Sequence, residues 1–253
     1  MSTEPDTNLT QDEIKVWRKT QRAELIARRA AIPPAQRKTW NDRITELLIG
    51  GFASPPEAVV GFCWPYKGEF DARYAVRAWR GHGARAALPE VVANRAPLRF
   101  RLWQPGVPMR AGVYDIPVPD GTEIVVPDIA VVPMNGFDAC GYRLGYGGGF
   151  FDRTLAACER RIVAIGVAYE VLRLDTIHPQ PYDIPMDFVV TEKGIYAAGG
   201  VQLEAVDEAE SGKRFARLLL GRRLPRAAFG SELSSPVCYA DQFPEYWGDK
   251  PGN

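Results

Sequence analysis

Several patterns that assign a function at sight are missing from this chain of 253 residues. Its four cysteines are widely scattered and form no Cys-x-x-Cys pair, so the sequence indicates neither a zinc site nor a disulfide framework. No apolar run approaches the ~20 residues of a membrane-spanning helix, and the N-terminus is polar and acidic, unlike a signal peptide. We therefore expect a cytoplasmic protein that does not associate with a membrane.

The chain also lacks an excess of charge of either sign. Lysine plus arginine and aspartate plus glutamate each number 31, which gives no overall field for nucleic acid or a membrane surface. Charge is unevenly spread, since residues 12–43 hold nine basic residues against four acidic ones, and a solvated basic helix face is the plain interpretation of that cluster. The 46% hydrophobic content supports a sizeable core, so we expect a folded protein acting on small molecules and no nucleic-acid partner.

The most informative stretch is a glycine-rich segment, residues 141–153, which reads Gly-Tyr-Arg-Leu-Gly-Tyr-Gly-Gly-Gly-Phe-Phe-Asp-Arg. An apolar strand pattern precedes it and a helical pattern follows it. Glycine lets a ligand approach the backbone, and a loop that enters a helix directs several free N–H groups at one point. Arg143 and Arg153 add positive charge, so the segment predicts an anion site. Asp152 fits better if a divalent cation accompanies a phosphate.

Two common phosphate fingerprints fail on this segment. No lysine follows its glycines, so it is not a Walker loop, and Gly-x-Gly-x-x-Gly cannot be placed from Gly145 or Gly147. The alternative is a flexible glycine hairpin between two elements.

Apolar strand patterns alternate with helical patterns along most of the chain. This alternation predicts a three-layer α/β/α fold with a mostly parallel central sheet, Rossmann-like, preceded by a pair of helices. In such sheets ligands gather at the carboxyl ends of the strands, where the expected loops also lie. We expect strands at 58–64, 84–88, 98–103, 125–133, 161–169 and 188–191, and helices at 12–31, 35–48, 72–80 and 150–159.

We place the domain at residues 12–198, after a disordered N-terminus at 1–11. Residues 199–253 form an extension of unknown role. Phe215, Leu218 and Leu219 suit a short amphipathic helix, and aromatic residues follow it. The extension either packs on its own domain or meets a protein partner. The later aromatic residues are Phe229, Tyr239, Phe243, Tyr246 and Trp247.

The glycine-rich segment resembles the signature of the 5-formyltetrahydrofolate cyclo-ligase family, also called methenyltetrahydrofolate synthetases. The resemblance runs from about residue 14 to 195, through Asp128, Pro133, Phe137 and Asp138 upstream and Asp183, Asp187, Thr191 and Glu192 downstream. It implies an α/β fold related to sugar-phosphate isomerases and CoA-transferases. It also implies an enzyme that uses ATP and Mg²⁺ to convert 5-formyltetrahydrofolate to 5,10-methenyltetrahydrofolate.

The resemblance also implies roles for individual residues, and no side chain is needed as a nucleophile. Asp152 and Asp183 would hold Mg²⁺, whereas Asp187 begins a strand and is structural. Trp64, Glu69 and Tyr146 would hold the folate, although Trp64 could equally belong to the core. His178 is expected to be a loop residue rather than a base. The residues implied to bind ATP are Arg18, Lys19, Arg22, Arg143, Leu144, Gly145, Tyr146, Gly147, Gly148, Gly149, Phe150 and Phe151.

Three positions of the glycine-rich segment depart from the family pattern, and Ile116-Pro117 is a modest departure where the family usually has Glu-Pro. Phe150 and Phe151 stand where relatives usually have tyrosines, and Gly148 stands where many have lysine. The two phenylalanines and the C-terminal extension motivate one rival hypothesis, a non-catalytic relative that binds nucleotide or folate and acts through that extension. A second rival is an α/β enzyme of the sugar-phosphate isomerase or CoA-transferase type, in which Glu69 alone is catalytic and ATP is not needed.

Overall fold

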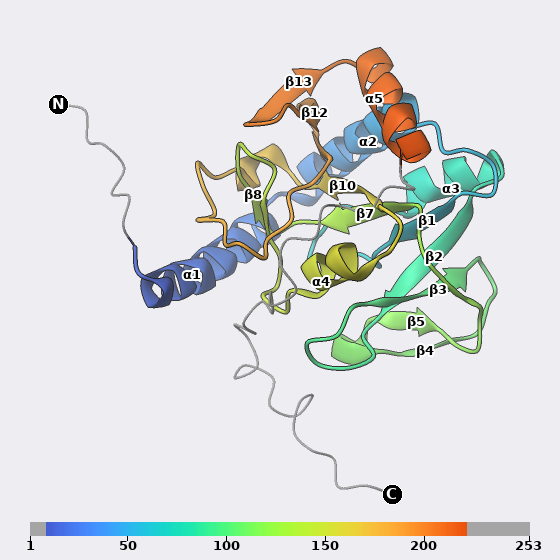
Figure 1. Ribbon diagram of the computed structural model, residues 1–253, viewed down its shortest axis with the longest axis horizontal. Coiled ribbons are helices and arrows are strands. Elements are labelled where there is room, and N and C mark those ends of the chain that lie inside the picture. Colours follow the sequence, from blue (N-terminus) through green and yellow to red (C-terminus); the bar gives the residue numbers. More distant parts are fainter. Residues whose placement is uncertain (1–8, 222–253) are drawn as a thin grey trace, which may run out of the picture.

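The computed structural model describes residues 9–221, which form a sheet with helices on both faces (Figure 1). The helices are α1 (Gln11–Ala30), α2 (Pro34–Gly51), α3 (Arg73–Gly81), α4 (Phe150–Ala157) and α5 (Glu208–Gly221), with 3-10 turns at Val113–Asp115 and Glu170–Leu172. The strands are β1 (Val59–Phe62), β2 (Arg85–Glu90), β3 (Arg99–Trp103), β4 (Met109–Ala111), β5 (Pro117–Pro119), β6 (Ile124–Val125), β7 (Ile129–Pro133), β8 (Gly136–Phe137), β9 (Arg143–Leu144), β10 (Val163–Val167), β11 (Phe188–Thr191), β12 (Gly194–Ala198) and β13 (Leu203–Val206).

The central sheet has nine strands in the order β13-β12-β11-β10-β7-β1-β2-β3-β6. Its middle five strands, from β11 to β2, run parallel, and the strands at both edges are antiparallel. The predicted parallel centre is confirmed, and the antiparallel additions make the whole sheet mixed. Parallel strands of this kind are buried on both faces, which explains why they read as continuous apolar runs.

The two faces of the sheet are covered unequally. Val131 of β7 faces a large core to which α2 contributes Ile44 and α3 contributes Trp79. The next residue, Val132, points to the opposite face, where Leu155 of α4 covers it. Successive side chains of a strand alternate between faces, so each apolar run supplies both layers. The three-layer prediction is therefore confirmed, and among the described helices α4 lies opposite the other four.

The N-terminal pair of helices forms as predicted. α1 lies one residue earlier than expected at both ends, whereas α2 begins one residue early and ends at Gly51, three residues beyond the expected end. α1 begins at Gln11, one residue inside the segment expected to be disordered, because Thr10 and Glu13 form a capping box at its start. Residues 1–8 lie outside the described part of the chain. Pro33 and Pro34 separate the two helices, with Pro34 at the first position of α2, where its missing N–H costs nothing.

Residues 203–221 complete the main fold rather than starting a separate extension. β13 pairs with β12, and α5 then packs beside α2. Phe215 is buried, with ring centroids 5.3 Å from Phe52 and 6.4 Å from Phe188. The predicted amphipathic helix is present, and it packs on its own domain, which is one of the two alternatives for the extension. The five aromatic residues from 229 to 247 lie outside the described residues.

The strand predicted at 125–133 does not lead straight into the glycine-rich segment. It divides into β6 and β7, and the β8–β9 hairpin then stands between β7 and the loop. The hairpin places Arg143 in β9, where backbone pairing with Phe137 fixes its position. Within residues 9–221, no helix combines the length and the apolar character that crossing a bilayer requires.

Candidate functional site

A cavity of about 740 Å³ opens beyond the carboxyl ends of β1 and β7. This volume lies in the range of sites that enclose a small organic ligand. One wall is α1, another is the loop that follows β1, and a third is the glycine loop, defined here as residues 145–149. The β4–β5 hairpin, which the sequence did not connect with the site, contributes Val113, Ile116, Pro117 and Val118.

The glycine loop turns sharply into the start of α4. Gly147 and Gly149 have φ values of 93° and 62°, in the left-handed region that glycine adopts without strain. Gly149 is the N-cap of α4 and has no side chain to occupy the free N–H groups of the first turn. The loop carbonyls are fixed from both sides, since Arg22 Nε donates to Gly145 O at 3.1 Å and Arg153 Nη1 donates to Gly148 O at 2.6 Å. Backbone amides and positive charge therefore meet at this loop.

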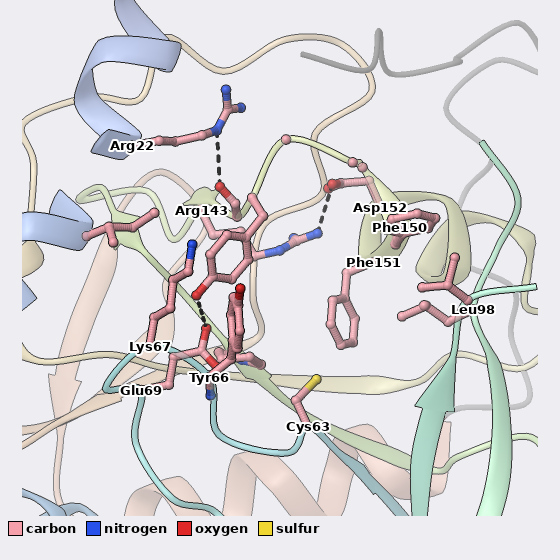
Figure 2. Close-up of a pocket in the computed structure, with 18 of the residues that line it drawn as sticks. Arg22, Cys63, Tyr66, Lys67, Glu69, Leu98, Arg143, Phe150, Phe151 and Asp152 are labelled. Atoms are coloured by element: carbon pink, nitrogen blue, oxygen red, sulfur yellow. Dashed lines mark hydrogen bonds and ion pairs between the residues drawn. The ribbon is translucent and has the colours of Figure 1, made fainter. Parts of the chain in front are cut away.

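Arg143 and Asp152 form an ion pair at the cavity wall, with 2.9 Å between Nη2 and Oδ2 (Figure 2). Burial raises the pKa of the Asp152 carboxyl, and the Arg143 guanidinium opposes that rise. The charge of Asp183, which lines the same cavity, raises the pKa of Asp152 further. Phe151 lies beside the pair, with its ring centroid 5.9 Å from the guanidinium carbon.

Arg18 contacts the segment that carries Asp183. Its side chain is buried, donates at 3.0 Å to the carbonyls of both Ile177 and His178, and forms an ion pair with Asp183. Arg18 therefore binds the 177–183 segment to α1. His178 lies in a loop, as expected, and contributes its carbonyl there.

Glu69 is buried on the opposite side of the cavity, in a network that the sequence only partly predicted. Its Oε1 accepts a hydrogen bond of 2.9 Å from the Tyr146 hydroxyl, and its Oε2 accepts one of 3.1 Å from the Tyr66 N–H. Arg29, which the sequence motifs did not single out, donates to Tyr146 at 2.8 Å. A signal for Arg29 was present, because Arg18, Arg22, Leu25 and Arg29 follow a spacing of four, three and four residues, which places them on one helix face.

Three of the predicted site residues do not lie simply in the cavity wall, each for a different reason. Trp64 is half-buried, lines the cavity and also packs edge-on against Trp103, so both of its alternatives hold in part. Lys19 is exposed and outside the cavity lining, because it lies about 100° around α1 from Arg18. Leu144 is a core residue, and its side chain does not reach the cavity. The remaining predicted residues all line the cavity, namely Arg18, Arg22, Glu69, Arg143, Gly145, Tyr146, Gly147, Gly148, Gly149, Phe150, Phe151, Asp152 and Asp183.

Asp187 has the structural role that the sequence predicted. Its Oδ2 accepts the Ala164 N–H at 2.8 Å, and it forms an ion pair with Arg161. Asp71 accepts the Arg73 N–H at 3.1 Å, so it satisfies one free donor at the start of α3, although the cap position itself is Ala72.

A glycine loop, buried arginines and carboxylates around one cavity, at the carboxyl ends of parallel strands, are the arrangement of an α/β enzyme with a small-molecule site. Comparison with known proteins makes the class specific. Residues 14–192 match the model of the 5-formyltetrahydrofolate cyclo-ligase family, and the chain belongs to that family. It is an enzyme of the cyclo-ligase class.

Relatives of assigned function share this classification. The 5-formyltetrahydrofolate cyclo-ligase of Mycolicibacterium smegmatis is 37% identical over 125 residues, which cover 46% of this chain and 64% of the relative. The Escherichia coli K12 cyclo-ligase is 27% identical over 180 residues, covering 67% of this chain and 96% of the relative. The structure of Aquifex aeolicus 5,10-methenyltetrahydrofolate synthetase matches with a TM-score of 0.59 and 28% identity, covering 74% of this chain and 96% of that one.

Proposed function

We propose that this protein uses MgATP to convert 5-formyltetrahydrofolate to 5,10-methenyltetrahydrofolate. The formyl oxygen is a poor leaving group because the formamide is stabilised by resonance. Transfer of the γ-phosphoryl group to that oxygen releases ADP and creates a phosphate ester. The neighbouring nitrogen of the folate then attacks the activated carbon, and inorganic phosphate leaves as the ring closes.

The observation that carries this proposal is the division of one cavity into two chemically distinct parts. The glycine loop, Arg22 and Arg143 supply backbone amides and positive charge along one side. Glu69 and Trp64 supply a buried carboxylate and an aromatic ring from the loop after β1. Phosphoryl transfer depends mainly on positioning and charge neutralisation, so a polyphosphate beside the first set and a pterin ring beside the second would bring the reacting atoms together.

The carboxylates at the glycine loop fit a magnesium ion that arrives with a nucleotide. Asp152 and Asp183 both line the cavity, and the charge of Asp183 acts on Asp152. Among residues 9–221, no group of three or more His, Cys, Asp or Glu side chains is placed to hold a metal by itself. Mg²⁺ commonly binds through one or two carboxylates together with waters and phosphate oxygens, so this pair is sufficient. When bound, the ion would neutralise charge on the transferred phosphoryl group.

The chain's own residues would hold the reactants in place. Arg22 and Arg143 would lie against the phosphates, and the amides at the start of α4 would receive phosphate oxygens. Glu69 would accept hydrogen bonds from N–H groups of the pterin ring, and Trp64 would lie against the ring's face. The Phe151 ring, 5.9 Å from the Arg143 guanidinium carbon, would keep water from that side of Arg143 and so strengthen the electrostatic interactions there.

The test is the absorbance of methenyltetrahydrofolate formed from 5-formyltetrahydrofolate, with and without MgATP, by the wild type and the Asp152→Asn variant. Asn keeps an oxygen for the Ile184 N–H but removes the negative charge. We expect product only with MgATP, and at least about a hundredfold loss of rate in the variant. Product without ATP, or no product from a folded wild type that still binds ATP, would refute the proposal. The second result would favour a protein that binds nucleotide without catalysis.

A further inference from the structure

Arg29 connects four segments that are far apart in the sequence. Its guanidinium is almost completely buried, at 1% exposed. Besides its bond to Tyr146, its Nε donates to Lys67 O at 3.0 Å and its Nη1 donates to Asn135 Oδ1 at 2.8 Å. α1, the loop after β1, the segment after β7 and the glycine loop thus meet at one side chain.

Tyr146 extends from the glycine loop to the opposite side of the cavity. Its hydroxyl accepts from Arg29 and donates to Glu69, so it stands between a cation and a carboxylate. Burial and the charge of Glu69 raise the pKa of the Tyr146 phenol, which keeps the hydroxyl protonated and able to donate. Arg29 is also 3.9 Å from Glu69, close enough for direct attraction.

The groups around Glu69 fix the orientation of its carboxylate and favour its ionised form. Burial raises the pKa of the Glu69 carboxyl, while the Arg29 charge, the Tyr146 hydroxyl and the Tyr66 N–H lower it. Glu69 in turn acts on Cys63, the residue that follows β1, because burial and then the Glu69 charge raise the pKa of the Cys63 thiol. Since Oε1 and Oε2 each accept one of these hydrogen bonds, the carboxylate plane is held in a single orientation.

We propose that Arg29 and Tyr146 are positioning residues that hold the Glu69 carboxylate in the orientation in which it meets the folate. The inference rests on the proposed function in taking Glu69 as the folate contact. The pterin ring offers adjacent N–H donors, and a carboxylate that must bind them gains affinity when it is oriented before the ligand arrives. Because Tyr146 belongs to the glycine loop, the same hydrogen bond joins the phosphate side of the cavity to the folate side.

The first experiment measures steady-state kinetics of the Tyr146→Phe variant. Losing the hydroxyl removes one donor from Glu69, so we expect the KM for 5-formyltetrahydrofolate to rise about tenfold. The KM for ATP and kcat should stay within about threefold of wild type. The matched control is Tyr169→Phe, which removes a buried hydroxyl bonded to Asn41 at 2.8 Å and outside the cavity lining. It should leave the folate KM unchanged.

The second experiment follows the pH dependence of the same KM. Tyr146→Phe and Arg29→Gln each remove a group that lowers the Glu69 pKa, so the KM should begin to rise at a higher pH than in wild type as the pH falls. Arg29→Lys restores the charge and should return the profile toward that of wild type. If Arg29→Gln does not fold, Tyr146→Phe and Arg29→Lys still decide the question.

The third experiment does not depend on activity. In protein labelled with ¹³C at glutamate carboxyls, the Glu69 resonance is identified by its loss in Glu69→Gln and titrated in wild type and Tyr146→Phe. We expect the midpoint to move upward in Tyr146→Phe. An unchanged midpoint together with an unchanged folate KM would overturn this inference. If the wild type forms no product and the midpoint still moves upward in Tyr146→Phe, the proposed function is overturned and the positioning role stands.

Discussion

Arg143 and Asp152 stand at the two ends of the glycine loop and bind the same residue, Ile184. Arg143 Nη1 donates to Ile184 O at 3.0 Å, and Asp152 Oδ1 accepts from Ile184 N–H at 3.0 Å. Their own ion pair closes the triangle. The loop is therefore fastened at both ends to the segment that carries Asp183, so loop and segment keep one relative position.

The Arg143→Lys variant tests whether the contacts of the guanidinium with Ile184 and Asp152 matter beyond its positive charge. Lysine keeps the charge but cannot contact Ile184 and Asp152 with the planar geometry of a guanidinium. We expect the KM for ATP to rise about tenfold and the free energy of unfolding to fall by about 1–3 kcal/mol, measured by ATP titration and urea denaturation. Arg161→Lys is the matched control, because Arg161 pairs with Asp187 outside the cavity lining. An equal rise of the ATP KM in both variants would contradict the prediction.

Two glycines of the loop should respond differently to alanine. A methyl group at Gly145 meets no atom within 4 Å, whereas one at Gly148 would lie 2.6 Å from the Phe150 ring. Gly145→Ala should leave the melting temperature unchanged and weaken ATP binding, because only a ligand close to the backbone would meet the methyl. Gly148→Ala should lower the melting temperature by a few degrees, since the ring must move. Unchanged ATP affinity in Gly145→Ala would show that the nucleotide does not approach the loop there.

Glu90 should give the fold a specific sensitivity to acid. Burial alone would raise its pKa, but hydrogen bonds from Arg99 and Arg101 outweigh burial and lower the pKa to about 2, from an ordinary 4.5. A carboxyl whose pKa is lower in the folded state stabilises the protein above the unfolded value and loses that contribution as the pH falls toward 2. Glu90→Gln should cost roughly 1–2 kcal/mol at pH 7, allowing for partly exposed arginines. The difference from wild type in urea denaturation should shrink by more than half between pH 6 and pH 3.

Arg18 and Lys19 are neighbours in sequence but should behave differently when changed to glutamine. Arg18→Gln leaves Asp183, whose side chain is only 10% exposed, without its ion pair, which costs about 3 kcal/mol of unfolding free energy, and it loosens residues 177–183. Limited proteolysis should then cut within that segment. Lys19→Gln changes an exposed side chain, and we expect its melting temperature and ATP KM to match those of wild type. A raised ATP KM in Lys19→Gln would restore the role implied by family resemblance.

The elements that sequence predicts well are those whose pattern is local. β11 falls where it was expected, at Phe188–Thr191, and α4 begins at Phe150 as predicted. Apolar runs and the glycine-to-helix junction are sufficient for such assignments. The glycine-rich segment likewise predicts most of one cavity wall, because its glycines, arginine and aspartate are contiguous in the chain.

What escaped prediction depends on tertiary contacts. The role of Arg29 arises because α1 passes over Lys67, Asn135 and Tyr146, which are distant in sequence. β13 was missed because it forms by pairing with β12, and a largely exposed edge strand of four residues has little apolar pattern of its own. Leu144 shows a second limit of sequence prediction. It lies within the glycine-rich segment, but membership of that segment does not decide which way its side chain points.

The way α1 is attached has a consequence for dynamics. Of its four buried residues, Arg18, Arg22, Leu25 and Arg29, only one is apolar. Water can replace guanidinium hydrogen bonds, so α1 should open locally at a lower free energy than the sheet, which unfolds only with the whole core. Its backbone amides should exchange with deuterium well before those of β7 and β10. Because α1 is also a wall of the cavity, bound substrate should slow that exchange. The exchange rate of the α1 amides would therefore show whether the site is occupied.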